Sequence, residues 1–579
     1  MKTFIAISIL IIFVQVSFAV TRFVTPLGAG ALNGSSWANA YAGNSLQVAI
    51  TASAVGDEVW VAAGLYTTTT GTNRAISFSM KNDVAIYGSF IGTESLLSQR
   101  IFTNGLTSIL SGEIGAGGIG DDSYIIVSNF GLNNTAIIDG FIVRDGNNNQ
   151  PISNTTGLGG GIYNDGRNAG NVCSPTIRNC LITNNSAGFG GGIFNNGNNN
   201  GVSLPLILNC VIANNTATNG GGGIDNYGTN NGNASPTITN CIFYNNTAVQ
   251  RAGGMYCWGG SNGNSSPIVL NTIFVNNSAT DAGGVICDRL NNGAAGSSGT
   301  SNPTFRNCIF WGNTATGTGP QFQVLGGATF TATYTDIDLT GQTTPNIISG
   351  AGTGNINSNP LFTNVANGAG VDGIWFTSDD GLQLQSTSPC INVGNNVGVP
   401  STDLLFNNRI FNTTVDMGAY EYFCTVPTQP TIIIGDTTVC IDTFNYAVTN
   451  VSGLTYLWTL IPNAFGNIIG IGNVIDVNFT TSGNATLNVY AINSCDTSIV
   501  QSQMLQINAI PTPSISGLTT ICSSDTSIFT INTGVNGSSY NWTVIGGTII
   551  SGCSISDTSC IVQWGNAGTG SINVTQTNP

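Results

Sequence analysis

Short runs of alternating apolar and polar residues, separated by Asn and Gly, fill the chain from Val20 to about Phe362. Runs such as Cys241-Ile242-Phe243 have the two-residue period of a β-strand. We find no stretch with a sustained helical period and helix caps. The pattern therefore predicts short strands joined at corners by Asn and Gly, the residues that most readily adopt left-handed backbone conformations.

Two features of this pattern, a glycine string and an asparagine, repeat along the chain with nearly the same period. The last glycine of each glycine string recurs at intervals of 31, 31, 31 and 30 residues, at Gly161, Gly192, Gly223, Gly254 and Gly284. An asparagine after the next strand keeps almost the same spacing, at Asn179, Asn209, Asn240, Asn271 and Asn307. A repeat of about 30 residues made of short strands predicts the coils of a parallel β-helix.

Stacked coils would bring equivalent residues about 4.8 Å apart along the axis. One expected inward column is Cys180, Cys210, Cys241, Thr272 and Cys308, and a second is Ile182, Ile212, Phe243, Phe274 and Phe310. We interpret the cysteines as small buried apolar residues rather than as metal ligands, because one member is Thr. The five asparagines that precede the first column are expected to form a ladder of amides, each bonded to the next.

Composition narrows the possible functions. The chain has 27 acidic and 12 basic residues, a formal charge of -15, which argues against nucleic acid as a partner. It has no histidine, so a Ser-His-Asp or Cys-His catalytic system is excluded. Residues 1–19 have the pattern of a secretory signal peptide, and no later segment is apolar enough to span a membrane. A secreted or cell-surface protein is therefore expected.

Several motifs carry a family resemblance. "GDEVWVAAGLY", "GSFIGTESLLSQR" and the repeats "SPTIRNCLITNNSA" resemble exported Bacteroidetes β-helix proteins of the pectin-lyase-like type, and the repeats also resemble outer-membrane adhesins. "DGIWFTSDDGLQLQSTSPCINVG" and "VDMGAYEY" resemble the choice-of-anchor segment that ends many such proteins. The resemblance implies an all-β chain with a right-handed parallel β-helix over residues 20–423, including a closing segment at about 355–423. Arg409 is expected to pair with Asp416 and Glu421 there and to close the last coil.

After residue 423 the glycine strings stop, and two units with short strands and a central Trp follow. They resemble PKD-like β-sandwiches of the immunoglobulin-like class, at residues 427–510 and 511–579. The resemblance implies one disulfide between Cys440 and Cys495 and another between Cys553 and Cys560. It also implies that Cys522 lacks its family partner and that the second unit is incomplete.

Acidic residues offer two candidate sites. Asp372, Asp379 and Asp380 lie in a Gly-rich loop and could supply the oxygen ligands that Ca²⁺ prefers, the only cofactor expected. On the repeats, Asp281, Asp288 and Arg289 form the best local cluster of charge, which we interpret as a surface ion pair. No catalytic residue is assigned.

The function expected from these observations is non-enzymatic adhesion, or binding of polysaccharide or another surface ligand. Two alternatives remain: a polysaccharide lyase that uses Arg and Ca²⁺, and a structural spacer. The sequence carries no signal for an oligomeric state.

Overall fold

The computed structural model describes residues 19–102, 104–115, 117–153, 155–290, 298–342, 348–349, 353–423, 426–493, 495–532 and 537–577. The expected signal peptide therefore lies, apart from Ala19, outside the described residues. The chain divides into two compact units, residues 1–423 and 424–579. The expected all-β fold is confirmed: stacked parallel sheets form a β-helix in the first unit, and antiparallel sheets dominate the second.

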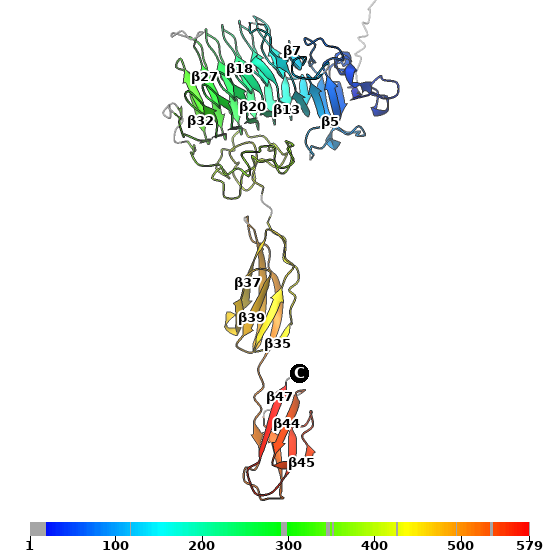
Figure 1. The fold of residues 1–579 in the computed structure, drawn as a ribbon, viewed down its shortest axis with the longest axis vertical. Coiled ribbons are helices and arrows are strands. Elements are labelled where there is room, and N and C mark those ends of the chain that lie inside the picture. The colour runs from blue at the N-terminus through cyan, green and yellow to red at the C-terminus, as the bar shows by residue number, and fades with distance from the viewer. Residues whose placement is uncertain are drawn as a thin grey trace, which may run out of the picture. The chain divides into compact units, whose positions relative to one another are not determined.

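Each full coil of the β-helix contributes one strand to each of four parallel sheets, and Figure 1 shows the stack from β5 to β32. A twelve-stranded sheet among the described residues contains β1 (Thr21–Thr25), β2 (Tyr41–Ala42), β3 (Glu58–Ala62), β5 (Ala85–Phe90), β8 (Ile137–Asp139), β12 (Thr176–Arg178), β16 (Leu206–Leu208), β20 (Thr237–Thr239), β24 (Ile268–Leu270), β28 (Thr304–Arg306), β32 (Phe330–Thr333) and β34 (Ile348–Ser349).

The next strand in each coil belongs to a nine-stranded sheet, again counted over the described part of the chain. Its strands are β4 (Gly64–Thr67), β6 (Ser108–Ser111), β9 (Phe141–Arg144), β13 (Leu181–Thr183), β17 (Val211–Ala213), β21 (Ile242–Tyr244), β25 (Ile273–Val275), β29 (Ile309–Trp311) and β33 (Asp336–Ile337).

Two further sheets complete the coils where the structure describes them. The six-stranded sheet contains β10 (Asn147–Asn148), β14 (Ser186–Phe189), β18 (Thr216–Gly220), β22 (Thr247–Ala248), β26 (Ser278–Ala279) and β30 (Thr314–Ala315). The seven-stranded sheet contains β7 (Val127–Phe130), β11 (Ile162–Asp165), β15 (Ile193–Asn196), β19 (Ile224–Tyr227), β23 (Met255–Trp258), β27 (Val285–Asp288) and β31 (Phe322–Leu325).

Both expected inward columns are buried in the core. The phenyl rings of Phe243, Phe274 and Phe310 stack with centroids 4.4 and 4.7 Å apart. In the cysteine column each Sγ donates to the carbonyl two residues earlier, as Cys210 does to Leu208 at 3.2 Å. Thr272 makes the same bond to Leu270 at 2.8 Å, which explains why it can replace a cysteine. The column is thus a packing feature.

Asparagine forms two corners of each coil. Asn209 and Asn214, which flank β17, have φ of 51° and 57°, and their equivalents in the other coils are also left-handed. An asparagine side chain tolerates this conformation better than other non-glycine residues do. The corners therefore follow from the repeat itself.

One α-helix breaks the all-strand pattern. The helix α1 (Leu46–Ala52) buries Leu46, Ala49 and Ile50 against the first coils of the core. Short 3-10 turns occur at η1 (Trp37–Asn39), η2 (Gly43–Ser45), η3 (Leu97–Gln99) and η5 (Asn463–Phe465). The helix spans seven residues, so its period is too short to be detected in the sequence.

The closing segment starts on the last coil, where Ile356 pairs with the strand β33, and then covers the side of the β-helix. Residues 353–423 consist of turns, and their apolar side chains, including Trp375 and Leu404, pack on the outward side chains of the nine-stranded sheet, such as Ile242 and Ile273. Tyr244 donates to the carbonyl of Ala366 at 2.9 Å. The segment therefore lies on the last coil at its start, and closure of that coil by Arg409 with Asp416 and Glu421 stays a prediction.

Arg409 lies in the interior of the closing segment, and its guanidinium contacts three other residues of it. Its side chain is fully buried, and Nε lies 3.9 Å from Glu421 Oε2. Its Nη2 donates to the carbonyls of Asp416 and Gly418. The expected partners are therefore both present, although Asp416 contributes its backbone oxygen.

The second unit contains two β-sandwiches. In the first, one sheet has β35 (Thr438–Cys440), β37 (Thr455–Ile461), β40 (Gly483–Ile492) and β41 (Gln501–Asn508), and the other has β36 (Thr443–Ala447), β38 (Gly466–Ile469) and β39 (Val474–Phe479). In the second, the sheets are β42 (Ile515–Ser516), β43 (Thr526–Ile531), β45 (Gly547–Gly552) and β46 (Ser559–Trp564), and β44 (Ser539–Ile545) with β47 (Ser571–Thr577). Trp458 and Trp542 are core residues of the two.

One of the two expected disulfides is present. Cys553 is bonded to Cys560. Cys440 is a free thiol, whereas Cys495 is disulfide-bonded, so the expected Cys440–Cys495 pair is wrong. Cys440 pairs in register with Asn508, beside the start of β40, and Cys495 follows the end of that strand. A strand of ten residues separates the two by roughly 30 Å, far beyond the reach of a disulfide.

Candidate functional site

The outward face of the seven-stranded sheet carries a file of aromatic side chains. Along these strands alternate residues point into the core, so Ile224 and Asn226 are inward and Asp225 and Tyr227 are outward. Neighbouring rings lie 5.8, 6.1 and 5.0 Å apart, centroid to centroid, along the file Tyr163, Phe194, Tyr227 and Trp258. Tyr227 and Trp258 remain partly exposed.

A cavity of about 250 Å³ opens onto this file. One wall is the loop between β10 and β11, which contributes Ile152, Ser153 and Leu158, and another is Phe189 at the end of β14. The floor is the sheet itself, with Phe194, Asp225, Tyr227 and Trp258. An apolar wall with few polar groups is typical of sites for small ligands.

Asp225 is the charged side chain in this cavity. It is 1% exposed, and neither carboxylate oxygen has a hydrogen-bond partner among the described residues. Burial raises the pKa of its carboxyl well above the ordinary value. A buried carboxyl without a donor is costly, so the site favours a ligand that supplies hydroxyl or ammonium groups.

A closed network of polar groups lies beside the cavity. Arg251 Nη1 donates to Tyr256 Oη at 3.0 Å and lies 3.4 Å from Asp288 Oδ2. Tyr256 Oη donates to the same oxygen at 2.8 Å. Tyr256 and then Asp288 raise the pKa of Arg251. The network joins β23 to β27, and it pairs Asp288 with Arg251, whereas the sequence suggested a cluster of Asp281, Asp288 and Arg289.

Neighbouring groups also fix the orientation of the Trp258 side chain. Its Nε1 donates to the carbonyl of Leu290 at 2.9 Å, and its ring lies 6.0 Å from that of Tyr256. The indole face is therefore oriented before any ligand arrives, which lowers the cost of ordering it on binding.

The sequence pattern does not identify this aromatic face as a candidate site. Asp225 appears in the sequence only as one of a few scattered acidic residues, and the aromatic residues occupy changing positions in the repeats. The inward positions of a coil keep their residue types, because they stack on one another. One sequence signal could have revealed this face. The strand after each glycine string has two outward positions, and in four successive coils these positions are aromatic or acidic, except for Asn196.

The predicted calcium ligands, Asp372, Asp379 and Asp380, do not form a cluster of metal ligands. Asp379 Oδ2 accepts from the backbone N–H groups of Val371 and Asp372 at 2.7 and 3.1 Å. Asp380 Oδ2 accepts from Phe376 N and Tyr420 Oη. Among the described residues, the three carboxylates are not part of a group that could hold a metal ion. Calcium at this loop stays a prediction that the geometry does not favour.

The expected amide ladder is interrupted. Asn209 donates to Asn179 at 3.3 Å and Asn307 to Asn271 at 3.4 Å. Asn240 donates instead to the carbonyl of Thr402 in the closing segment. These asparagines lie at the corner that the closing segment covers, so part of their bonding goes outward. A continuous ladder runs elsewhere, through Asn185, Asn215, Asn246, Asn277 and Asn313.

A larger cavity in the β-helix unit lies against the closing segment. It has a volume of about 510 Å³ and is bounded by Phe102, Phe376 and Phe406. Arg100, which also borders it, is bonded to the buried Asp139 at 2.8 Å. This cavity is apolar, and its charged group is already satisfied.

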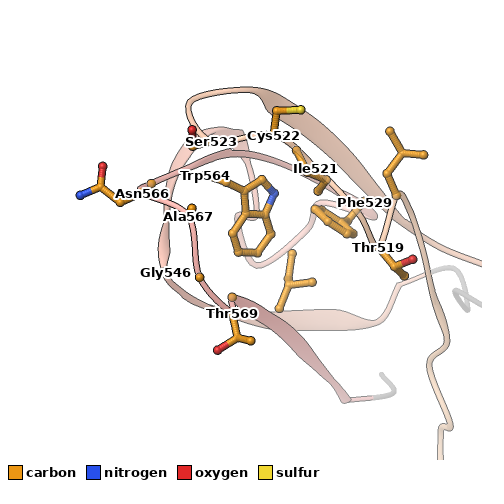
Figure 2. A pocket seen from close by; sticks show the side chains of 15 residues that line it. Thr519, Ile521, Cys522, Ser523, Phe529, Gly546, Trp564, Asn566, Ala567 and Thr569 are labelled. Atoms are coloured by element: carbon orange, nitrogen blue, oxygen red, sulfur yellow. The ribbon is translucent and has the colours of Figure 1, made fainter.

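A further cavity, of about 320 Å³, lies in the second sandwich. Figure 2 shows the ring of Trp564 in it beside Phe529, with Cys522 and Ser523 close by. Trp564 Nε1 is buried without a hydrogen-bond partner among the described residues. The cavity lining contains no Asp, Glu, Lys or Arg side chain, and Cys522 is its titratable group.

Comparison with known proteins identifies the second unit. Residues 426–507 and 508–579 each match the family model of the PKD-like domain. The chain has no significant match among curated proteins. Within the part of the chain that the structure describes, no helix is long and apolar enough to cross a membrane.

Two similar solved structures each match about a quarter of the chain. The FN1–FN3 domains of chicken CNTN1 are 13% identical, with a TM-score of 0.16, over 26% of this chain and 62% of that one. Murine CEACAM1b is 12% identical, with a TM-score of 0.15, over 26% of this chain and 92% of that one. TM-scores of this size carry no argument about fold or function.

Proposed function

We propose that this protein is a non-enzymatic adhesion protein that binds polysaccharide along the outward face of its seven-stranded sheet. The observation that carries the proposal is Asp225, a buried carboxyl with both oxygens unpartnered at the floor of the aromatic cavity. Sugar hydroxyls are the donors that such a carboxyl lacks.

The aromatic file supports the same ligand class. Sugar rings present C–H groups that pack on the faces of aromatic side chains, while their hydroxyls bond to neighbouring polar groups. Tyr227 and Trp258 are partly exposed and lie 5.0 Å apart on successive coils. The coil spacing of a β-helix would allow further sugar units to continue along the file toward Phe194.

An extracellular location is part of the proposal. It is supported by the signal-peptide pattern of residues 1–19, the Cys553–Cys560 disulfide and the two PKD-like domains. The resemblance of the β-helix motifs to exported Bacteroidetes proteins of the pectin-lyase-like type agrees with it.

The proposal is tested by binding to an array of neutral, amino-substituted and acidic polysaccharides. We then expect Tyr227→Ala and Asp225→Asn to weaken binding of the best ligand about tenfold each, roughly the loss of one stacking or hydrogen-bonding contact. Isothermal titration calorimetry measures the change.

A matched control is Phe406→Ala, which alters an aromatic residue of the other large cavity. This variant should bind like the wild type. If it loses binding and Tyr227→Ala does not, the site is wrong. Release of unsaturated products from an acidic polysaccharide would favour the lyase alternative, and absence of binding to every glycan would favour the spacer.

A further inference from the structure

Three carboxylates converge in the loop between β6 and β7. One oxygen from each of Glu113, Asp121 and Asp122 lies within 4.8 Å of the others, the only such acidic group among the described residues. The loop lies away from residues 372–380, where the sequence suggested calcium. Like charges this close repel one another unless a cation or a proton neutralises them.

Asp122 adds an independent observation. Its side chain is 3% exposed, and Oδ1 has no hydrogen-bond partner among the described residues. A buried carboxylate oxygen without a donor is unfavourable, and native structures pair nearly all such atoms. The unmet acceptor is an oxygen of the carboxylate that forms the group with the two more exposed ones.

The basic residue bonded to this loop, Arg74, contacts backbone oxygen atoms. Arg74 donates through Nε to the backbone oxygen of Asp122 at 2.6 Å and through Nη2 to that of Asn147 at 2.9 Å. Its guanidinium lies 4.3 Å from the centre of the Tyr124 ring. No ion pair between Arg74 and the three carboxylates occurs in the described part of the chain.

A fourth acidic residue lies near the group and is already neutralised. Asp145 Oδ2 accepts from Ser111 Oγ at 2.7 Å and lies 3.3 Å from Arg144 Nε. Arg144 therefore balances Asp145, which is not one of the three carboxylates of the group.

We propose that Glu113, Asp121 and Asp122 bind a divalent cation, Ca²⁺. The ligands are all oxygen atoms, which suits a hard cation, and Ca²⁺ accepts the irregular geometry of a loop better than Mg²⁺ does. Asp122 anchors the ion from the buried side, and Glu113 and Asp121 bind it from the solvent side. The bound ion would tie the loop to the strand β6 that precedes it.

Calorimetric titration of the metal-free full chain with CaCl₂ tests the proposal. We expect one binding event in the wild type, weakened about tenfold or more in Glu113→Gln and in Asp122→Asn, because each removes one charged ligand. Glu113 is on the solvent side, so its variant should fold even if Asp122→Asn does not. Circular dichroism of each variant checks this.

The control is the double variant Asp372→Asn with Asp379→Asn, in the other acidic loop. It should bind Ca²⁺ as the wild type does, and Ca²⁺ should raise the melting temperature of both. Absence of binding in the wild type would overturn the proposal. So would binding that survives Glu113→Gln unchanged or that is lost in the control variant. Polysaccharide binding is measured separately, so neither result depends on the other proposal.

Discussion

Asparagine occupies two adjacent positions at one corner of four successive coils, and the two differ in what their amides bond to. Asn214 is left-handed, with φ of 57°, and turns the chain. The next residue, Asn215, is fully buried and joins three coils. Its Nδ2 donates to Ile182 O at 2.9 Å and Asn246 Oδ1 at 3.0 Å, and its Oδ1 accepts from Asn185.

We expect Asn215→Ala to destabilise the β-helix by about 2–4 kcal/mol, because it leaves buried donors and acceptors in two neighbouring coils without partners. The urea concentration at the unfolding midpoint measures the loss. Asn209→Gly is the matched control, since Gly keeps the left-handed corner and only one side-chain bond to Asn179 disappears. A loss in the control as large as in Asn215→Ala would contradict the ladder.

At the scale of the strand and its coil, the glycine strings set how closely successive coils approach. A Cβ added to Gly223 would lie 2.6 Å from the carbonyl oxygen of Gly254 in the next coil and 3.0 Å from the Phe243 ring. The same distance of 2.6 Å recurs between Gly192 and Gly223. The strings are therefore a requirement of stacking, which is why they keep the period of the coil.

Gly223→Ala should accordingly lower the free energy of unfolding by about 1–3 kcal/mol, since the backbone of the next coil must move. Gly71→Ala serves as the comparison, because its Cβ would meet only Thr69 Oγ1 at 3.6 Å, an ordinary contact. Thermal denaturation of the two variants followed by circular dichroism gives the difference. Equal melting temperatures for both would show that the coils can separate freely.

At the scale of the whole β-helix unit, the closing segment buries acidic residues that the sequence presents as ordinary loop residues. Burial raises the pKa of Asp380 to about 7 and that of Glu421 to about 7. Asp336, which accepts from the buried Cys390 thiol, also has a pKa raised by burial to about 7. In the unfolded chain these carboxyls titrate near pH 4.

Between about pH 4 and 7 the folded protein therefore holds more protons than the unfolded one, so the free energy of unfolding falls as the pH rises. The stabilisation is complete below about pH 4 and is lost through pH 7. We expect the urea midpoint to decrease from pH 5 to pH 8, and to decrease less in Asp380→Asn, whose amide cannot ionise. Asp372→Asn, on the exposed side of the same loop, should keep the wild-type dependence. A pH-independent midpoint would contradict the burial of these carboxyls.

The sequence predicts the environment of a residue that packs on its own equivalents in neighbouring coils. It does not predict the environment of a residue that contacts a different part of the chain. The core columns at Cys180 and Ile182 and the left-handed corner at Asn179 are set by stacking on equivalent residues 30 or so positions away, so the repeat alone reveals them. The interrupted ladder at Asn240 was missed because its amide meets Thr402, 162 residues away. The position of Cys440 was missed because strand order, not spacing along the chain, decides which cysteines meet.

The sequence by itself determined that this chain forms stacked coils of short strands, because periodicity and corner residues are local properties repeated many times. The PKD-like sandwiches followed from a resemblance of their motifs to that family. Only the tertiary structure decided where the closing segment lies and which outward side chains share a cavity. Asp225, Tyr227 and Trp258 come from two coils whose outward positions need not match, and Asp122 is buried although it lies in a loop. The burial of a side chain, and the side chains that it meets, depend on which other parts of the chain pack over it. A local sequence pattern does not contain that information.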